Sequence, residues 1–430
     1  MSTRTATVVL AGVALLAAAG CTVNPVTGKN QLDLLGEAQE IELGKSLYQG
    51  SIQQSLGPIE DGHVQELVGE VGRRLAEVSH RPALPYEFTA VSDPEVNAFA
   101  LPGGKICITR GLLTRLESVD GMANVMGHEV GHVTARHAVA QYNRQIFATA
   151  ITVGAMVYMG TSDSDYRGVV GLGAILGTQL ALAHYSREQE RQSDDLGIDY
   201  AVKAGYAPRG MIETQKVLLS LQKKEPGAVQ NLFATHPMSA ERLATAEQQV
   251  AALPAELRDR PLRTREYQVA MRDVMGEREA WDLAGEGRRL LGAEKFKEAE
   301  GKLAEASRRG AGEGMIRTLH AVSLVLGKRE GAAVSEAREG ARLAPQAFLA
   351  QSIGGQVLLK PDPGAALACF ERAEEVLPGQ PDVALLRGAA LEKLNRKQEA
   401  IAAYRQARER DPNGKIGAEA TKRLQALGAG

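Results

Sequence analysis

The chain of 430 residues is longer than one typical domain, so two or three folded units are expected. Lysine and arginine number 50 against 52 acidic residues, which argues against nucleic acid as a partner. Hydrophobic residues make up 44 % and aromatic residues only 4 %, while glycine and alanine are abundant. This composition favours a globular protein of closely packed helices.

Residues 1–20 have the pattern of an export signal. Arg4 stands in a short polar start, and the apolar run that follows ends at Ala19, too short to span a bilayer comfortably. The four residues that end at Cys21 resemble a bacterial lipobox, which implies that Cys21 is lipidated and becomes the mature N-terminus. Because Thr22 follows, the resemblance also implies sorting to the outer membrane. A buried N-terminal helix is the alternative.

Residues 21–35, with a proline, a glycine and several polar side chains, are expected to form a tether. Apolar residues at three-to-four-residue spacing between 41 and 78 then predict amphipathic helices. Pro82 and Pro85 end this pattern, and a strand is expected over 86–91.

Two short apolar runs lie between Asn97 and Thr109, joined by Pro-Gly-Gly, and predict a β-hairpin just before the next helix. Such a hairpin can offer an edge strand that holds an extended peptide by backbone hydrogen bonds. An ordinary structural hairpin fits the same residues equally well.

The segment 125–137 contains His-Glu-x-x-His. In a helix His128 and His132 stand one turn apart on the same face, so both imidazoles can bind one ion. Zinc held by two imidazoles needs a third protein ligand and keeps an open position, where the pKa of water falls to about 7. Glu129 is free to act as general base toward that water. Two histidines on a solvated helix are the alternative.

Two further apolar stretches, 147–160 and 169–182, are shorter than the roughly 20 residues that a transmembrane helix requires. They are expected to be core or cleft-lining helices, with a hairpin that touches the membrane as the alternative. His137 lies five residues after His132, about 140° around a helix, and is therefore expected at the surface or beside a ligand.

The third metal ligand is expected some fifty residues downstream. Glu190 and Asp194 are four residues apart, so a helix presents both carboxylates on one face. Glu190 could complete the zinc ligands while Asp194 orients a ligand imidazole. On residue type alone Glu188 competes with Glu190, and a solvated helix face is the alternative to both.

Together these motifs resemble the M48 family of zinc metallopeptidases. The resemblance rests on His128-Glu129-x-x-His132 and on Ser186-Arg187-x-x-Glu190-x-x-Ser193-Asp194-x-x-Gly197. It implies that Glu190, not Glu188, is the third ligand. A second segment, Thr235 to Arg242, is also similar to the family. It implies that His236 lies near the metal, where it stabilises an oxyanion or covers the zinc in a resting state, and that Arg242 supports it. A helix-capping His-Pro turn is the alternative for His236.

The last part of the chain is periodic. A polar linker is expected over 256–280, and beyond it alanines and prolines recur every 33 or 34 residues. These are Ala299, Ala333, Ala366 and Ala400, with Pro345, Pro378 and Pro412. The period resembles tetratricopeptide repeats, stacked helix pairs whose curved groove binds a protein partner. A plain helical bundle is the alternative.

The predicted fold is therefore mainly α: an α+β zincin-like domain with a small sheet over 36–255, then an α-solenoid of repeats over 281–425. Cys107 and Cys369 are expected to be two buried thiols rather than a disulfide.

The expected function is that of a zinc metalloendopeptidase with one zinc per chain, lipid-anchored on the periplasmic face of the outer membrane. Within M48 the two-part layout is similar to proteases that monitor outer-membrane protein assembly, which implies unfolded or stalled β-barrel proteins as substrates. The alternative is a chaperone or assembly scaffold whose metal site is silent or gated.

Overall fold

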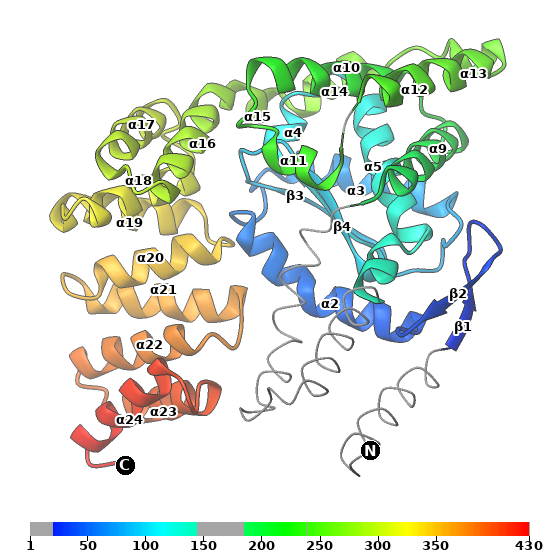
Figure 1. The fold of residues 1–430 in the computed structure, drawn as a ribbon. Helices are drawn as coiled ribbons and strands as arrows, with labels where there is room; N and C mark the ends of the chain where they lie inside the picture. Colours follow the sequence, from blue (N-terminus) through cyan, green and yellow to red (C-terminus); the bar gives the residue numbers. More distant parts are fainter. Residues whose placement is uncertain (1–19, 144–184, 238, 430) are drawn as a thin grey trace, which may run out of the picture.

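The computed structural model describes residues 20–143, 185–237 and 239–429. The expected export signal and the apolar stretches 147–160 and 169–182 lie outside the described residues. Figure 1 shows a part built around a small sheet and, beside it, a column of stacked helices that ends at the C-terminus. This arrangement confirms the predicted fold class. Within the described ranges, no helix combines the length and apolarity needed to cross a membrane.

The first elements form a hairpin. Strand β1 (Gly20–Val23) pairs antiparallel with β2 (Asn30–Asp33). Asn24 closes the turn because its side-chain oxygen accepts from the N–H groups of Val26 and Thr27, both at 3.0 Å. Asp33 is 4 % exposed and pairs with Arg136. The expectation of a tether over 21–35 is therefore wrong. These residues begin with a folded hairpin, and its buried Asp33 carboxylate is neutralised by an arginine that is distant in sequence.

The N-terminal part of the chain contains a three-stranded sheet. Its strands are β3 (Glu87–Val91), β4 (Ala98–Leu101) and β5 (Lys105–Thr109). Strand β5 lies in the middle, parallel to β3 and antiparallel to β4. In the turn η1 (Pro102–Gly104), Gly103 and Gly104 have φ of 70° and 87°, which favours glycine. The predicted strand and hairpin are confirmed, and both β3 and β4 are edge strands.

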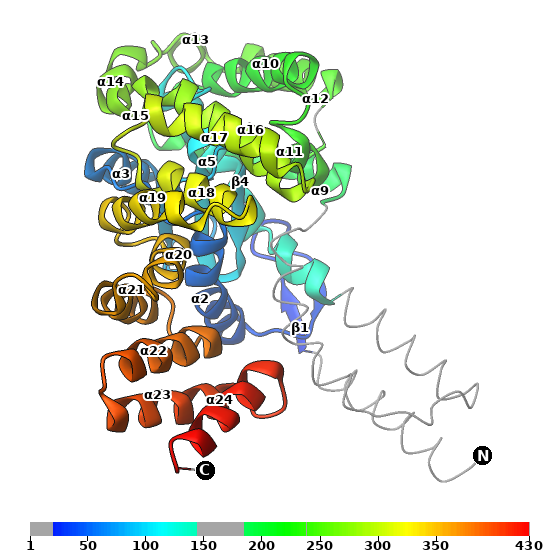
Figure 2. The ribbon, with the colours of Figure 1, turned by 90° about the vertical axis from the view of Figure 1, so that its left-hand side faces the viewer.

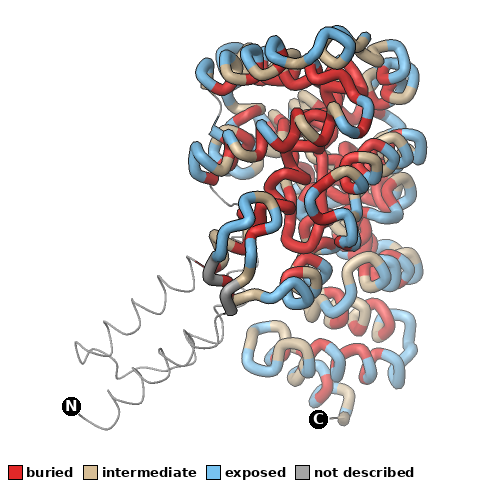
Figure 3. The backbone as a smooth tube through the Cα atoms, turned by 90° about the vertical axis from the view of Figure 1, so that its right-hand side faces the viewer, coloured by how far each residue is buried: buried red, intermediate tan, exposed pale blue. Residues whose placement is uncertain are grey.

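Helices cover this sheet. Their bounds are α2 (Glu37–Gln54), α3 (Gly62–Glu77), α4 (Arg110–Leu113), α5 (Val119–Thr134), α9 (Arg187–Lys203), α10 (Arg209–Lys224), α11 (Gln230–Thr235) and α12 (Ala240–Ala252). Helix α3 begins at the cap Asp61 and buries Val64, Val68, Val71 and Leu75, the predicted apolar face. Figure 3 shows buried positions gathered in the interior of this part and exposed ones on the outer turns.

Helices α5 and α9 cross with their backbones in contact. A Cβ added to Gly127 of α5 would lie 2.9 Å from the carbonyl oxygen of Gly197 of α9. A Cβ added to Gly197 would lie 2.9 Å from the backbone nitrogen of His128. One turn further along, a Cβ on Gly131 would lie 3.2 Å from the Cα of Ser193. Only hydrogen at the two facing positions permits this approach.

The expected linker over 256–280 is also wrong. Three short helices fill this stretch: α13 (Ala255–Arg258), α14 (Thr264–Ala270) and α15 (Arg272–Gly276). Tyr267, Met271 and Val274 are buried in the same core as the sheet. The Tyr267 hydroxyl donates to the carbonyl of Leu113 at 2.7 Å. The charged residues that suggested a linker lie on the outer face of a packed segment.

The column of helices has the predicted repeat construction. Its members are α16 (Arg278–Gly292), α17 (Phe296–Arg309), α18 (Gly314–Leu326), α19 (Glu330–Leu343), α20 (Phe348–Leu358), α21 (Pro363–Val376), α22 (Pro381–Lys393), α23 (Lys397–Arg410) and α24 (Lys415–Ala426). The ring of Phe370 packs on Gly355, and the ring of Tyr404 packs on Gly388, one repeat later. Cys107 and Cys369 are both free and buried, as predicted.

The repeats pack against the first part of the chain. Figures 1 and 2 show the column alongside α2. The Gln53 side chain of α2 donates to the Gln346 carbonyl at 3.0 Å and accepts from the Phe348 N–H at 2.8 Å. Helix α2 thus contacts the turn between α19 and α20.

A buried arginine joins the two parts. The guanidinium of Arg110 lies 4.5 Å from the ring centroid of Trp281. It also donates to Glu277 at 3.1 Å and to Glu313 at 3.4 Å. Burial, together with the adjacent Glu313, raises the pKa of Glu277 to about 8.

The close crossing predicts that Gly197→Ala lowers the free energy of unfolding by about 2 kcal/mol, because the new Cβ meets backbone atoms that cannot rotate away. The matched control is Gly301→Ala in α17, where nothing lies within 4 Å of the added Cβ. That change should stabilise the protein by up to about 1 kcal/mol. Chemical denaturation of both variants measures the difference, and equal effects would contradict a tight crossing.

The raised pKa of Glu277 predicts a pH-dependent gain from Glu277→Gln. Between its ordinary value of 4.5 and about 8, the unfolded state loses this proton before the folded state does, so the wild type loses stability as pH rises. Glu277→Gln has no carboxyl to titrate at this position, so it does not lose stability in this way. Its melting temperature should exceed that of the wild type at pH 9, with a gap that shrinks toward pH 5. A gap that does not change with pH would refute the assignment.

Candidate metal centre

Helix α5 carries the His-Glu-x-x-His residues through the interior. It begins at Ser118, whose hydroxyl accepts from the Gly121 N–H at 2.9 Å. Every residue of α5 except Val125 is buried. Because the helix is surrounded, His128 and His132 keep fixed positions one turn apart.

Helix α9 brings the carboxylates. Ser186 and Gln189 form a capping box, in which the Ser186 hydroxyl accepts from the Gln189 N–H at 3.2 Å and the Gln189 amide oxygen accepts from the Ser186 N–H at 3.0 Å. The start of α9 is thereby fixed one turn before Glu190. Glu190 and Asp194 share the face that is turned to α5, whereas Glu188 is exposed.

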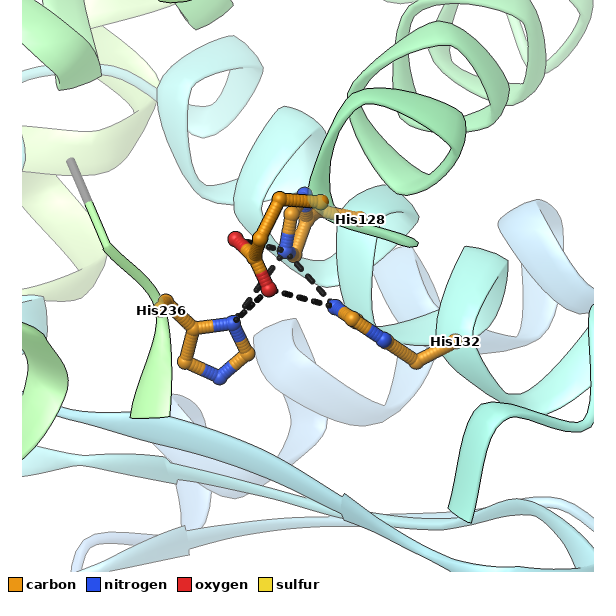
Figure 4. Close-up of side chains that lie close together, drawn as sticks. His128, His132 and His236 are labelled. Carbon is orange, nitrogen blue, oxygen red and sulfur yellow. Dashed lines mark hydrogen bonds and ion pairs between the residues drawn. The ribbon is translucent and has the colours of Figure 1, made fainter. Parts of the chain in front are cut away.

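Four side chains converge between these helices. One donor atom from each of His128, His132, Glu190 and His236 lies within 4.8 Å of the others. Figure 4 shows the three imidazoles pointing toward one another. The Nε2 atoms of His132 and His128 are 3.0 Å apart. The Glu190 carboxylate lies 3.4 Å from His132 Nε2 and 3.6 Å from His128 Nε2.

This spacing fits a divalent metal ion. Donors bound at 2.0–2.1 Å to a tetrahedral ion are separated by about 3.3 Å. The measured separations of 3.0 to 3.6 Å scatter around that value. Two neutral imidazoles and a carboxylate are also the donors that such ions take in hydrolytic sites. The residues present therefore fit the expected metal.

Charged partners hold the ligands from behind. Asp194 lies 2.9 Å from His128 Nδ1, so it orients this imidazole as expected. Arg242 donates to both Asp194 oxygens and to Glu190, each at 2.7 Å. Burial opposes the charge on Asp194, but hydrogen bonds from His128 and Arg242 outweigh it and lower the pKa of this carboxyl. Arg242 also donates to the carbonyl of Pro237, the residue after His236, at 3.0 Å.

Glu129 differs from the other carboxylates of the site. It is 2 % exposed, and its Oε2 has no hydrogen-bond partner among the described residues. Burial raises the pKa of Glu129, partly offset by the charges of His236 and His128. An available oxygen with raised proton affinity is what a general base requires.

His236 lies between the ligands and this base. Its Nδ1 is 3.0 Å from Glu190 Oε1, and its Nε2 is 3.8 Å from Glu129 Oε1. Its backbone N–H also donates to the Leu232 carbonyl at the end of α11, so the capping alternative holds for its main chain. The side chain nevertheless supplies a fourth donor to the group. Burial opposes the charge on His236, but Glu190 and Glu129 raise its pKa.

Two further residues contact the ligand His132. The ring of Tyr185 stacks on it with centroids 3.9 Å apart. His137 is buried, with its Nδ1 2.9 Å from His132 Nδ1, so the second of its two expected positions is the observed one. Apart from its place next to the Ser186 cap, no local pattern pointed to Tyr185, because its stacking on His132 is a tertiary contact.

A small apolar pocket opens beside the site. His128, Glu129 and His236 form one wall, and the remaining lining is mainly apolar. It includes Ala98, Leu112, Val125, Met211, Leu218 and Leu232. Ala98 belongs to the edge strand β4, so this strand borders the site.

The crossed helices bring together a candidate metal site of the His-Glu-x-x-His type beside the sheet. Residues 62–250 of this chain match the model of Peptidase family M48.

Curated relatives extend the comparison. The beta-barrel assembly-enhancing protease of Escherichia coli (strain K12) is 28 % identical over 225 residues, 52 % of this chain and 46 % of the relative. The mitochondrial metalloendopeptidase OMA1 of Schizosaccharomyces pombe is 29 % identical over 181 residues, 42 % of this chain and 51 % of the relative. The chain thus spans about half the length of these relatives.

Among solved structures, a tetratricopeptide-repeat protein with an unusual peptide-binding site aligns over 48 % of this chain and 99 % of its own. The two chains are 16 % identical in this alignment, with a TM-score of 0.32.

The contacts of Asp194 predict that Asp194→Asn weakens metal binding about tenfold, because the amide keeps the shape but loses the charge that holds His128 and Arg242. Glu190→Ala should abolish binding, since a donor is lost. Competition with a chromogenic chelator measures both affinities. Undiminished metal content in Glu190→Ala would reject this ligand.

Proposed function

We propose that the protein is a zinc-dependent metalloendopeptidase that cleaves unfolded or misassembled proteins of the bacterial envelope. The observation that carries this proposal is the meeting of His128, His132 and Glu190. The buried carboxyl of Glu129 lines the same pocket as His128. When bound by these three ligands, zinc supplies a Lewis acid and lowers the pKa of water to about 7.

Glu129 and His236 carry the remaining chemistry in this proposal. Glu129 takes the proton of the attacking water and passes it to the leaving amine. The raised pKa of its buried carboxyl suits this acceptance. His236 lies close enough to the ligand atoms to cover the metal in a resting state, and its movement would free it to donate to the oxyanion.

The substrate proposal rests on β4 and on the relatives. An edge strand beside the site suits any extended chain, because backbone hydrogen bonds do not depend on side chains. The name of the Escherichia coli relative refers to β-barrel assembly. We extend this to unfolded or stalled outer-membrane proteins as substrates, with the repeats binding a substrate or partner protein. The lipobox-like Cys21 would anchor the chain to the periplasmic face of the outer membrane.

A second candidate function is that of a chaperone or assembly scaffold with a silent or gated metal site. The specific observation in its favour is His236, whose donor completes a group of four. A site with four protein donors leaves no position for water until one of them moves.

Glu129→Gln tests the proposal. The variant should bind zinc like the wild type but lose cleavage of a denatured protein by at least about a hundredfold, because the amide cannot accept the proton. Glu188→Gln, the same change at an exposed position of α9, should retain full activity. Removal of zinc by a chelator should abolish cleavage in both the wild type and this control.

The outcomes separate the two candidate functions. Cleavage by Glu129→Gln would refute the general base. Loss of cleavage with continued assistance to outer-membrane assembly would show that both activities coexist. A wild type that assists assembly without ever cleaving would establish the scaffold.

A further inference from the structure

The C-terminal end of the metal helix α5 is held by a buried arginine. Arg136 is 5 % exposed and has φ of 58°, a left-handed conformation that turns the chain out of the helix. Its guanidinium pairs with Asp33 and also donates to three other groups. These are Glu40 Oε2 at 3.1 Å, Thr22 Oγ1 at 3.1 Å and the Leu35 carbonyl at 2.8 Å.

Several of these partners belong to the β1–β2 hairpin or to the chain directly after it. The hairpin has a second attachment to the same helix end. The Asn24 side chain at its turn donates to the carbonyl of Ala135, the residue that caps α5, at 3.1 Å. The hairpin is thus docked on the end of the metal helix by buried polar contacts, where a tether would leave that end to solvent.

The residue that follows Arg136 touches a metal ligand. His137 Nε2 lies 2.9 Å from the Gln192 amide oxygen, and His137 Nδ1 lies 2.9 Å from His132 Nδ1. An amide oxygen only accepts, so His137 Nε2 carries the hydrogen and Nδ1 accepts. His132 Nδ1 is then the donor. Its Nε2 is left without hydrogen and faces His128 and Glu190, as a ligand atom must.

The two ligand imidazoles are therefore oriented by different groups. A carboxylate, Asp194, accepts from His128 Nδ1, whereas a neutral imidazole, His137, accepts from His132 Nδ1. The carboxylate is fixed by Arg242 within the site. His137 contacts Gln192 and Ser193 of α9, and it directly follows the turn at Arg136, so its position also depends on the hairpin.

We propose that the β1–β2 hairpin is a positioning element of the metal site, which acts through Arg136 to fix His137 as the acceptor that orients His132. The inference rests on the proposed function in one respect, because it takes His132 as a zinc ligand. It adds that residues 20–33, more than ninety positions before that ligand, help to set the affinity for zinc.

A matched pair at His137 tests the hydrogen bond. His137→Phe fills the space without an acceptor and should raise the dissociation constant for zinc about tenfold or more. His137→Gln can still accept from His132 and donate to Gln192, so it should retain an affinity near that of the wild type. The visible absorption spectrum of the cobalt-substituted protein provides a second readout, because it reports the ligand geometry directly. His137→Phe should alter it and His137→Gln should not.

Asn24→Asp tests the hairpin. The aspartate keeps the acceptor that closes the hairpin turn but places a charge against the Ala135 carbonyl, so the hairpin should detach from α5. Zinc affinity should fall and the cobalt spectrum should change, although the variant lies outside the site. The control is Asp120→Asn, a buried change at the other end of the same helix, which loses charge against Arg263. It should lower the melting temperature and leave the cobalt spectrum unchanged.

The possible results distinguish a failure of the proposed function from a failure of the proposal about the hairpin. A wild type that binds no zinc would overturn both the proposed function and this inference. If the wild type binds zinc and His137→Phe binds it equally well, the inference about His137 and the hairpin fails, while the proposed function stands. If His137→Gln is as weak as His137→Phe, the contact is one of packing and the proposal fails. An unchanged zinc affinity in Asn24→Asp would show that the hairpin does not influence the metal site.

Discussion

The contact between the backbones of α5 and α9 is the constraint on which the rest of the structure depends. Helices usually pack with their axes about 8–10 Å apart because side chains intervene. Here Gly127 faces Gly197, and no side chain separates them. The imidazoles of one helix can therefore approach the carboxylates of another that begins more than fifty residues later in the chain. The separations of 3.4 and 3.6 Å between the Glu190 carboxylate and the two imidazoles follow from the absence of side chains at the crossing.

Paired buried charges then fix what the crossing brings together. The same arrangement recurs among the described residues, each time with one buried arginine between two carboxylates. Arg242 holds Glu190 and Asp194, and Arg136 holds Asp33 and Glu40. Each arginine links segments that are distant in sequence. Removal of one partner from a buried ion pair leaves an uncompensated charge, which commonly costs about 3–5 kcal/mol. These clusters therefore define positions more strictly than apolar contacts would.

Local patterns in the sequence were sufficient for much of this architecture. His128 and His132 are one turn apart in any helix, Pro-Gly-Gly predicts a turn with positive φ, and the period of 33 or 34 residues predicts the stacked pairs. Glu190 was different. Its residue type left Glu188 as a rival, and only the resemblance to a family distinguished them before the fold placed Glu188 in solvent.

The two wrong predictions share one cause. Polar composition suggested a tether over 21–35 and a linker over 256–280, yet both segments are folded. Asp33 is buried because Arg136, about a hundred residues away, neutralises it. Tyr267 is buried because the Leu113 carbonyl accepts its hydroxyl hydrogen. Composition reports how many polar groups a segment carries, whereas burial depends on whether a distant segment satisfies them.

The position of Arg110 has a consequence for any attempt to study the peptidase and repeat parts as separate fragments. The arginine lies in the first part, while Trp281 and both acidic partners lie at the start of the second or just before it. A fragment truncated ahead of α16 would expose this cation without its aromatic cover. The complementary fragment, which begins at α16, would retain Glu313 without its arginine. Poor yield or low solubility of either fragment would then reflect the broken interface, and would say nothing about the intact chain.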